Sequence, residues 1–244
     1  MQSTGLTTLK QWIMESDNLV FFGGAGVSTE SNIPDFRSPN GLYNQIHAYP
    51  YPPEIMLSAG FFYAHPADFF RYHFDKLVYA DAQPNAAHYA LARLEAAGKL
   101  KAIITQNVDG LHQMAGSRRV LELHGSAQRN YCLNCGAKYD LAFMLSVAPD
   151  IPYCLDCGGI VRPDVVLYEE ALPSNIMLAA EKAVRSADTM IVGGTSLVVY
   201  PAAGLVDLFN GRYLVLINKQ ATEYDSRADL VLREPIGQVL GEVV

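Results

Sequence analysis

The sequence is short of charged side chains and of long hydrophobic runs, and each shortage excludes a class of protein. Charged residues make up 18% of the 244 residues, and 18 Lys and Arg against 25 Asp and Glu give a net charge of −7. Nucleic-acid phosphates are bound by basic surfaces, so this balance argues against a nucleic-acid partner. The apolar run around 190–199 is broken by Gly193 and Gly194 and falls short of the ~18 residues that cross a bilayer. We therefore expect no nucleic-acid partner and no membrane partner.

The first residues also lack a targeting pattern. Met1–Lys10 has no basic segment followed by an apolar one, which is how a secretory signal begins. Hydrophobic residues make up 50% of the chain, and we find neither a repeat nor a low-complexity segment. A globular chain of 244 residues can bury a full core. We expect a folded, cytoplasmic protein.

Cysteine is scarce as well, and all four cysteines fall in one short stretch. Cys132 and Cys135 form one CxxC pair, and Cys154 and Cys157 form a second. This spacing predicts a tetrahedral Zn²⁺ site with four thiolate ligands. Because four thiolates leave no position for water or substrate, the metal is expected to stabilise structure. Two disulfides are the alternative, which the lack of a secretory signal disfavours.

Strand-like and helix-like segments alternate along most of the chain, which predicts an α/β fold with a parallel sheet. The run Leu19–Phe22 ends at Gly23 and Gly24, as a buried strand entering a tight turn does. We expect the other strands at Ala102–Ile104, Val120–Leu123, Asp164–Leu167, Thr189–Val192, Tyr213–Ile217 and Asp229–Leu232. Helices are expected near the N-terminus and near 84–98, 173–186, 201–210 and 235–242.

Two stretches do not fit the alternation and are interpreted as insertions into one domain. Residues 38–82 are rich in aromatic residues and proline, and 126–163 carry the cysteines. The predicted division of 1–244 is a Rossmann-like core (about 1–37, 83–125 and 164–244), a helical module (about 38–82) and a zinc module (about 126–163).

The first strand leads into the glycine-rich segment Gly24–Thr29. Glycines at such a turn let backbone N–H groups approach a pyrophosphate, and a following helix would add its positive N-terminal end. Thr29 replaces the third glycine of the strict dinucleotide fingerprint, so a plain glycine turn is the alternative.

Further polar clusters follow the other predicted strands. In an open α/β sheet, ligands bind at the carboxyl ends of the strands, so these clusters are expected to converge on one site. The clusters are Ile33–Arg37, Thr105–His112, His124-Gly125, Gly194–Leu197 and Asn218.

Taken in order, these motifs and the cysteine pairs resemble the sirtuins, the NAD-dependent protein lysine deacylases, in their short bacterial and archaeal form. The resemblance runs from about Leu19 to Asn218. It implies a cleft that holds NAD as co-substrate and an acyl-lysine protein or peptide, with one structural Zn²⁺ nearby. The implied products are free lysine, nicotinamide and O-acyl-ADP-ribose.

The resemblance also implies roles for individual residues. His124 is the expected general base, a task that suits an imidazole near neutral pH, and Asn107 is expected to act with it. Phe36 is expected to cover the ribose and Asp109 to accept the nicotinamide carboxamide. For Asp35, Asp109 and Asn218 a local capping role is the alternative. The full set of implied cofactor-binding residues is Gly24, Ala25, Gly26, Ser28, Asp35, Phe36, Arg37, Gln106, Asn107, Asp109, Gly194, Thr195, Ser196 and Asn218.

The peptide is expected to add as a strand between two segments that contain Val166, Tyr168 and Val198. Two departures from the family pattern stand out, Asn32 before Ile33–Arg37 and Glu169 where a glycine is usual.

Family members that remove dicarboxylic acyl groups carry a Tyr and an Arg three residues apart, where this chain has His73 and Lys76. We expect an apolar pocket and deacetylation, with longer aliphatic acyl groups as a further option. The rival functions are protein ADP-ribosylation and a non-enzymatic zinc-ribbon binding module.

Overall fold

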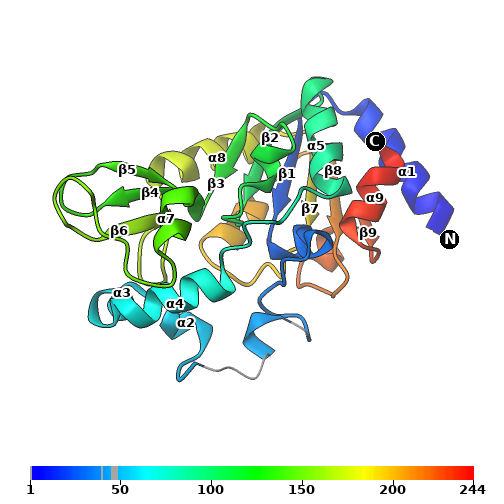
Figure 1. The fold of residues 1–244 in the computed structure, drawn as a ribbon. Coiled ribbons are helices and arrows are strands. Elements are labelled where there is room, and N and C mark those ends of the chain that lie inside the picture. Colours follow the sequence, from blue (N-terminus) through cyan, green and yellow to red (C-terminus); the bar gives the residue numbers. More distant parts are fainter. Residues whose placement is uncertain (1, 40, 45–48) are drawn as a thin grey trace.

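A six-stranded parallel sheet forms the centre of the molecule (Figure 1). The computed structural model describes residues 2–39, 41–44 and 49–244. The strands are β1 (Leu19–Gly23), β2 (Leu100–Thr105), β3 (Val120–Glu122), β7 (Thr189–Gly193), β8 (Tyr213–Ile217) and β9 (Leu230–Leu232). Their order is β3-β2-β1-β7-β8-β9, and each neighbouring pair is parallel. This is the strand order of dinucleotide-binding folds. The strands β2 and β3 are added on one side of β1, and the later strands β7, β8 and β9 are added on its other side.

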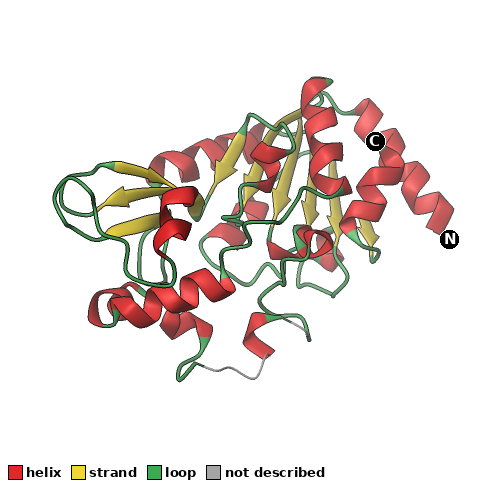
Figure 2. Ribbon diagram, viewed as in Figure 1, coloured by secondary structure: helices red, strands yellow, loops and turns green. Residues whose placement is uncertain are grey.

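Helices cover both faces of this sheet (Figure 2). One face packs against α1 (Gln2–Glu15), α5 (Ala86–Ala96) and α9 (Ile236–Val243); the other packs against α8 (Ser174–Ser186) and the 3₁₀ helix η4 (Ala202–Leu208). The alternation of side chains along β1 explains its apolar run. Leu19 and Phe21 enter the first cluster, whereas Val20 and Phe22 enter the second. A strand buried on both faces carries apolar residues at every position.

A second, three-stranded antiparallel sheet stands apart from the first. Its order is β5 (Lys138–Asp140), β4 (Gly125–Cys132) and β6 (Val161–Val165). We predicted a strand at Asp164–Leu167 within the parallel core, and that prediction is wrong. The chain returns from β4 through the cysteine segment without a crossover helix against the core, so it pairs antiparallel with β4.

The small sheet shares one hydrophobic cluster with the helical module. That module contains η3 (Leu42–Asn44), α2 (Pro53–Met56), α3 (Ala59–Ala64) and α4 (Pro66–Lys76), and α7 (Leu141–Val147) belongs to the small sheet's segment. Phe62, Phe69 and Phe70 pack in the same cluster as Met144 and Val161. Residues 40 and 45–48 of the expected helical module lie outside the described residues.

The segment after β1 differs from the predicted helix. It forms two 3₁₀ turns, η1 (Ala25–Val27) and η2 (Thr29–Ser31), and Asn32 ends the second in the left-handed region at φ 63°. Asparagine tolerates this conformation better than most residues, and Pro34 disfavours a helical Ile33. The short elements α6 (Leu111–Met114) and η5 (Asp225–Arg227) complete the fold.

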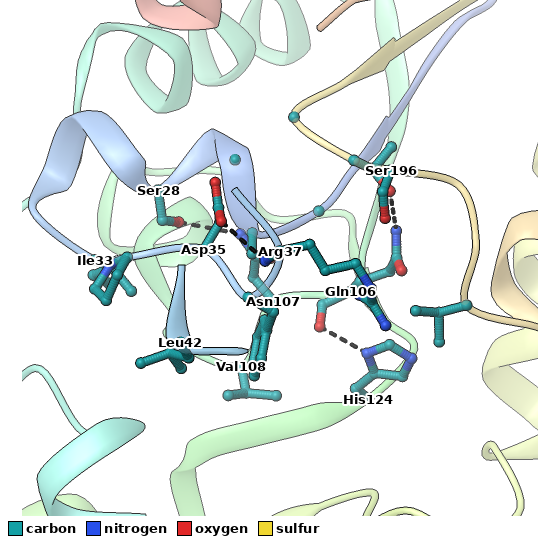
Figure 3. Close-up of a pocket in the computed structure, with 18 of the residues that line it drawn as sticks. Ser28, Ile33, Asp35, Arg37, Leu42, Gln106, Asn107, Val108, His124 and Ser196 are labelled. Atoms are coloured by element: carbon teal, nitrogen blue, oxygen red, sulfur yellow. Dashed lines mark hydrogen bonds between the residues drawn. The ribbon is translucent and has the colours of Figure 1, made fainter. Parts of the chain in front are cut away.

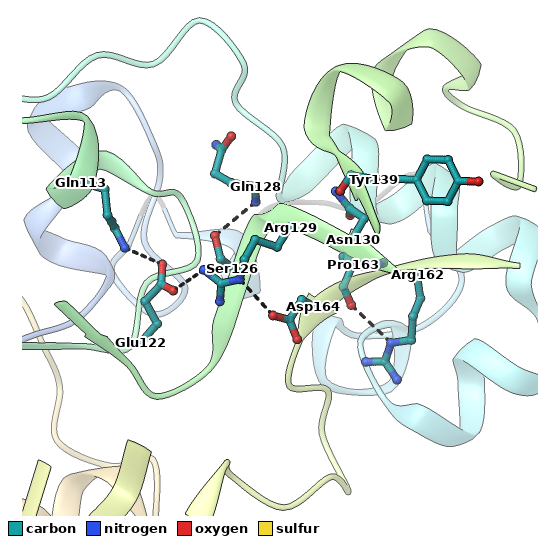
Figure 4. A network of polar contacts seen from close by, with 10 residues as sticks. All are labelled: Gln113, Glu122, Ser126, Gln128, Arg129, Asn130, Tyr139, Arg162, Pro163 and Asp164. Atoms are coloured by element: carbon teal, nitrogen blue, oxygen red, sulfur yellow. Dashed lines mark hydrogen bonds and ion pairs between the residues drawn. The ribbon is translucent and has the colours of Figure 1, made fainter. Parts of the chain in front are cut away.

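Arg129 links the two sheets (Figure 4). Its guanidinium donates to Glu122 at the end of β3 (2.6 Å) and to Asp164 in β6 (3.1 Å). Among the described helices, none combines the length and the apolar character that a bilayer crossing requires.

Candidate functional site

A cavity of about 960 Å³ opens where β1, β2, β7 and β8 end, and the helical module and the small sheet complete its walls. This volume lies at the upper end of ligand sites, which range over about 300–1,000 Å³. Every residue that the sequence assigned to catalysis, cofactor or substrate lines the cavity, except Val198. The Val198 side chain is exposed.

The glycine loop packs directly against the loop that follows β7. Gly26 N–H donates to the Gly194 carbonyl at 2.8 Å, and a Cβ on Gly26 would lie 2.7 Å from Gly194 Cα. A Cβ on Gly24 would lie 2.8 Å from Thr195 Cβ. These glycines are therefore needed for the contact between two loops, in addition to any approach of phosphate.

Ser28, Asn107 and Asp109 line the cavity and form one hydrogen-bonded group, of which Figure 3 labels Ser28 and Asn107. The Ser28 hydroxyl donates to Asp109 Oδ2 at 2.7 Å and accepts from Asn107 Nδ2 at 3.1 Å. Asp109 Oδ1 accepts the Leu111 N–H at 2.9 Å. Each carboxylate oxygen can accept another bond, so a contact with a ligand amide remains open to Asp109.

Gln106 connects the ends of two strands. Its side chain donates to Thr195 Oγ1 at 3.0 Å, and its N–H donates to the Gly23 carbonyl at 3.0 Å. The loops after β1, β2 and β7 are thus held together around one wall of the cavity.

His124 lies beside this wall, with its ring fixed by the backbone. Nδ1 is 2.8 Å from the Gln106 carbonyl oxygen. Because a carbonyl only accepts, Nδ1 carries the proton, which leaves the lone pair on Nε2. Burial lowers the pKa of His124, and the Gln106 carbonyl partly offsets that effect. The neutral imidazole can therefore accept a proton at neutral pH.

Gly125 explains why a glycine follows this histidine. Its φ is +75°, and a Cβ there would lie 1.9 Å from the Asp164 carbonyl oxygen. The His124 carbonyl accepts the Val166 N–H at 2.9 Å. Gly125 at the start of β4 therefore lies against β6 at a point where no side chain fits.

Asp35 and Asn218 line the cavity and also make local bonds. Asp35 Oδ1 accepts the N–H groups of Arg37 and Ser38, at 3.1 and 2.8 Å. Asn218 Nδ2 donates to the Gln220 carbonyl at 2.8 Å. Both side chains thus make local turn contacts, and their contacts with a cofactor remain predictions.

Two residues near the proposed peptide groove, Arg162 and Tyr43, were not predicted from the sequence. Arg162 is buried and forms a bidentate pair with Glu170, at 2.6 and 3.0 Å. Glu170 also accepts the Leu167 N–H at 2.8 Å, so the pair fixes the segment 165–170. Tyr43 contacts Tyr168 through their hydroxyl groups. A lone Arg and a loop Tyr have no spacing signal that separates them from ordinary surface residues.

His73 lies on the helical wall of the cavity. It is fully buried, and neither ring nitrogen has a hydrogen-bond partner within the described residues. Burial lowers its pKa to about 4, so it is neutral at pH 7. Lys76 also lines the cavity and pairs with Asp75 at 3.1 Å.

The four cysteines converge on one point. Their Sγ atoms all lie within 4.8 Å of one another, and the pairs Cys132–Cys157 and Cys135–Cys154 are 3.5 and 3.6 Å apart. A disulfide needs about 2.05 Å, whereas Zn–S bonds of about 2.3 Å in a tetrahedron set the sulfurs about 3.8 Å apart. The donor set therefore fits a structural zinc and excludes the disulfide alternative in this conformation. Tyr139 donates its hydroxyl to Cys154 Sγ at 3.2 Å.

Known proteins are similar in sequence to this chain over nearly its whole length. The Sir2 family profile matches residues 24–201. A Clostridium acetobutylicum protein named NAD-dependent protein deacetylase is 59% identical over 239 residues, which cover 98% of each chain. A Staphylococcus epidermidis protein of the same name is 42% identical over 244 residues, which cover 100% of this chain and 98% of that one.

Solved structures share its fold. A Sir2 structure with a deacetylated p53 peptide and 3′-O-acetyl ADP-ribose has a TM-score of 0.89 and 37% identity, covering 98% of this chain and 96% of its own. A structure of Sir2 with a p53 peptide and NAD⁺ has a TM-score of 0.84 and 37% identity, with the same coverage.

Proposed function

The chain belongs to the Sir2 family, and we propose that it is an NAD-dependent protein lysine deacetylase that contains one structural Zn²⁺. The observation that carries this proposal is His124, an imidazole whose Nδ1 is held by a carbonyl and whose ring lines a cavity large enough for two ligands. A binding module has no need of such a base.

The wall formed by the loops after β1, β2 and β7 is the proposed NAD site. NAD supplies the acceptor for the acyl group and releases nicotinamide. Gln106 and Thr195 offer amide and hydroxyl donors there beside the Ser28 hydroxyl, and Asp35, Phe36 and Arg37 line the same cavity. Asn107 and Asp109, which are joined through Ser28, are proposed to orient the nicotinamide ribose and the carboxamide.

His124 is proposed to accept a ribose hydroxyl proton at Nε2, for which its lowered pKa keeps it neutral. The acyl-lysine peptide is proposed to bind along Val166 and Tyr168, with Val198 on the opposite side. Acylated-lysine proteins are thus the proposed partners, and the cytoplasm is the proposed location.

Acetyl and other uncharged acyl groups are the proposed substrates. Phe36 and Leu57 give the helical side of the cavity an apolar character, and His73 is neutral there. A neutral imidazole offers a dicarboxylic acyl group no opposing charge at pH 7, and Lys76 is already paired with Asp75.

The test incubates the purified protein with NAD and an acetyl-lysine peptide, followed by mass spectrometry of the products. O-acetyl-ADP-ribose together with free lysine is the expected result, and a peptide that gains ADP-ribose would establish the rival transferase. Absence of nicotinamide release over a series of acyl peptides would contradict both enzymatic functions.

A further inference from the structure

The Tyr43 and Tyr168 hydroxyl groups lie 2.6 Å apart, and Tyr168 lines the cavity. Tyr43 follows the loop from Asp35 to Arg37, whereas Tyr168 belongs to the proposed peptide groove. The two residues are far apart in the chain. This bond therefore joins the loop over the proposed NAD site to the groove.

Tyr168 is the fixed member of this pair. Its N–H donates to the Leu57 carbonyl at 3.0 Å, and its carbonyl accepts the Ala59 N–H at 3.0 Å. The next residue, Glu169, accepts the Gly60 N–H at 2.9 Å while its own backbone is held at φ 77°. Three bonds to the helical module thus hold the backbone at Tyr168 in place.

Tyr43 is the organising residue of the loop. Its N–H donates to the Phe36 carbonyl at 2.9 Å, and its ring lies edge-on to the Phe36 ring with centroids 5.7 Å apart. The Arg37 guanidinium lies over the other part of the same ring, 5.1 Å from its centroid. A contact that fixes the Tyr43 ring therefore also orients Phe36 and Arg37.

We propose that Tyr43 and Tyr168 are positioning residues for the cofactor, because their hydroxyl pair holds the loop of Phe36 and Arg37 closed over the NAD site. The inference rests on the proposed function for the identity of the ligand. The contact with the groove thus preorganises the loop. Burial and the contact with the second hydroxyl raise the pKa of Tyr43, so the Tyr43 hydroxyl stays protonated throughout the working pH range.

The experiment removes one hydroxyl at a time from the full-length protein. Tyr43→Phe and Tyr168→Phe each keep both rings and delete the bond. The double variant lacks both hydroxyl groups and therefore lacks the same bond. Calorimetric titration with ADP-ribose measures closure without requiring turnover. Tyr89→Phe is the matched control, since Tyr89 is exposed on α5 and does not line the cavity.

Each single variant is expected to weaken ADP-ribose binding about three- to tenfold, the range that one net hydrogen bond supplies. The double variant should bind no more weakly than either single one, because the same bond is lost in all three. Unchanged binding in either single variant, or losses that multiply in the double variant, would overturn the proposal.

Limited proteolysis gives a second measurement, the accessibility of the loop at Arg37, which a role elsewhere in the fold would not change. Trypsin cleavage after Arg37 should be faster in both single variants by the same factor, and ADP-ribose should slow it. Equal cleavage rates in the variants and the parent would also contradict the hydroxyl pair. The deacetylase assay on the parent protein reports on the proposed function separately, since a parent that binds ADP-ribose without turnover fails that function alone.

Discussion

His124 is the residue whose chemistry depends most directly on its setting. Its ring is fixed by one carbonyl, and the same chain segment supplies Gly125, where a side chain cannot fit. The histidine and the glycine were recognisable in the sequence as a pair. The sequence did not show why a glycine is required there. The atom that excludes a side chain is the Asp164 carbonyl oxygen, which belongs to a strand later in the chain.

His124→Ala should reduce deacetylation about 10²- to 10⁴-fold, the usual loss when a general base is removed. Calorimetry should find NAD binding close to that of the parent, because the side-chain bonds of Ser28 and Gln106 are untouched. In the parent, the acid limb of kcat/KM should lie below pH 6.5, since burial lowers the pKa of His124 and only the neutral ring accepts a proton. Near-parent turnover in the variant would disprove the assignment.

Asp109→Asn should weaken inhibition by nicotinamide more than it weakens binding of ADP-ribose, which lacks nicotinamide. A charged hydrogen bond contributes about 1.5–3 kcal/mol, so the nicotinamide effect should be roughly 10- to 100-fold. Isothermal titration of both ligands checks the difference. Asn218→Ala is the contrasting variant and should weaken NAD and ADP-ribose alike. If Asp109→Asn weakens both equally, the carboxylate serves only to hold Ser28 and Leu111.

The elements show where sequence reasoning reached its limit. The parallel strands were predictable because each is an apolar run that ends in glycine or polar residues. The predicted strand Asp164–Leu167 also contains an apolar run, yet the structure has the strand at Val161–Val165, where it pairs with β4. Local pattern does not reveal a strand's partner, and here the partner is selected by the cysteine segment that turns the chain back.

Cys154→Ala should cost the protein its zinc and destabilise the small sheet. Cys132 and Cys154 are buried in the cluster that also holds Phe62 and Phe69 of the helical module. Structural zinc in small domains is worth about 10–16 kcal/mol, so the helical wall of the cavity should loosen with it. Metal analysis of the purified parent should find one zinc per chain. Cys154→Ser protein that retains full zinc and parent thermal stability would argue against a four-thiolate site.

At the scale of the whole molecule, buried neutral histidines make stability depend on pH. Burial lowers the pKa of His73 to about 4, of His88 to about 4 and of His112 to about 3. Between pH 6.5 and about 4 the unfolded chain binds protons that the folded chain refuses, so stability falls as pH falls. The slope is roughly 1.4 kcal/mol per pH unit for each histidine.

Urea unfolding at pH 7.5 and pH 5.5 measures this slope. His112→Leu should be less sensitive to the pH change than the parent, because one imidazole no longer titrates. Loss of zinc at low pH would act on both proteins alike, so the difference between their slopes isolates the histidine. Equal slopes would mean that His112 is protonated in the folded state. His65, which is exposed, provides His65→Leu as the control.

The position of β1 has a consequence for synthesis on the ribosome. β1 pairs with β2 on one side and with β7 on the other, and β7 begins at Thr189. The second edge of β1 therefore stays unpaired until most of the chain has been synthesised. Until then Phe21 and Phe22 belong to an open edge, which favours aggregation of unfinished chains. Nascent chains stalled before Thr189 should be protease-sensitive and chaperone-bound, and the released full-length chain should fold slowly, as long-range parallel pairing requires.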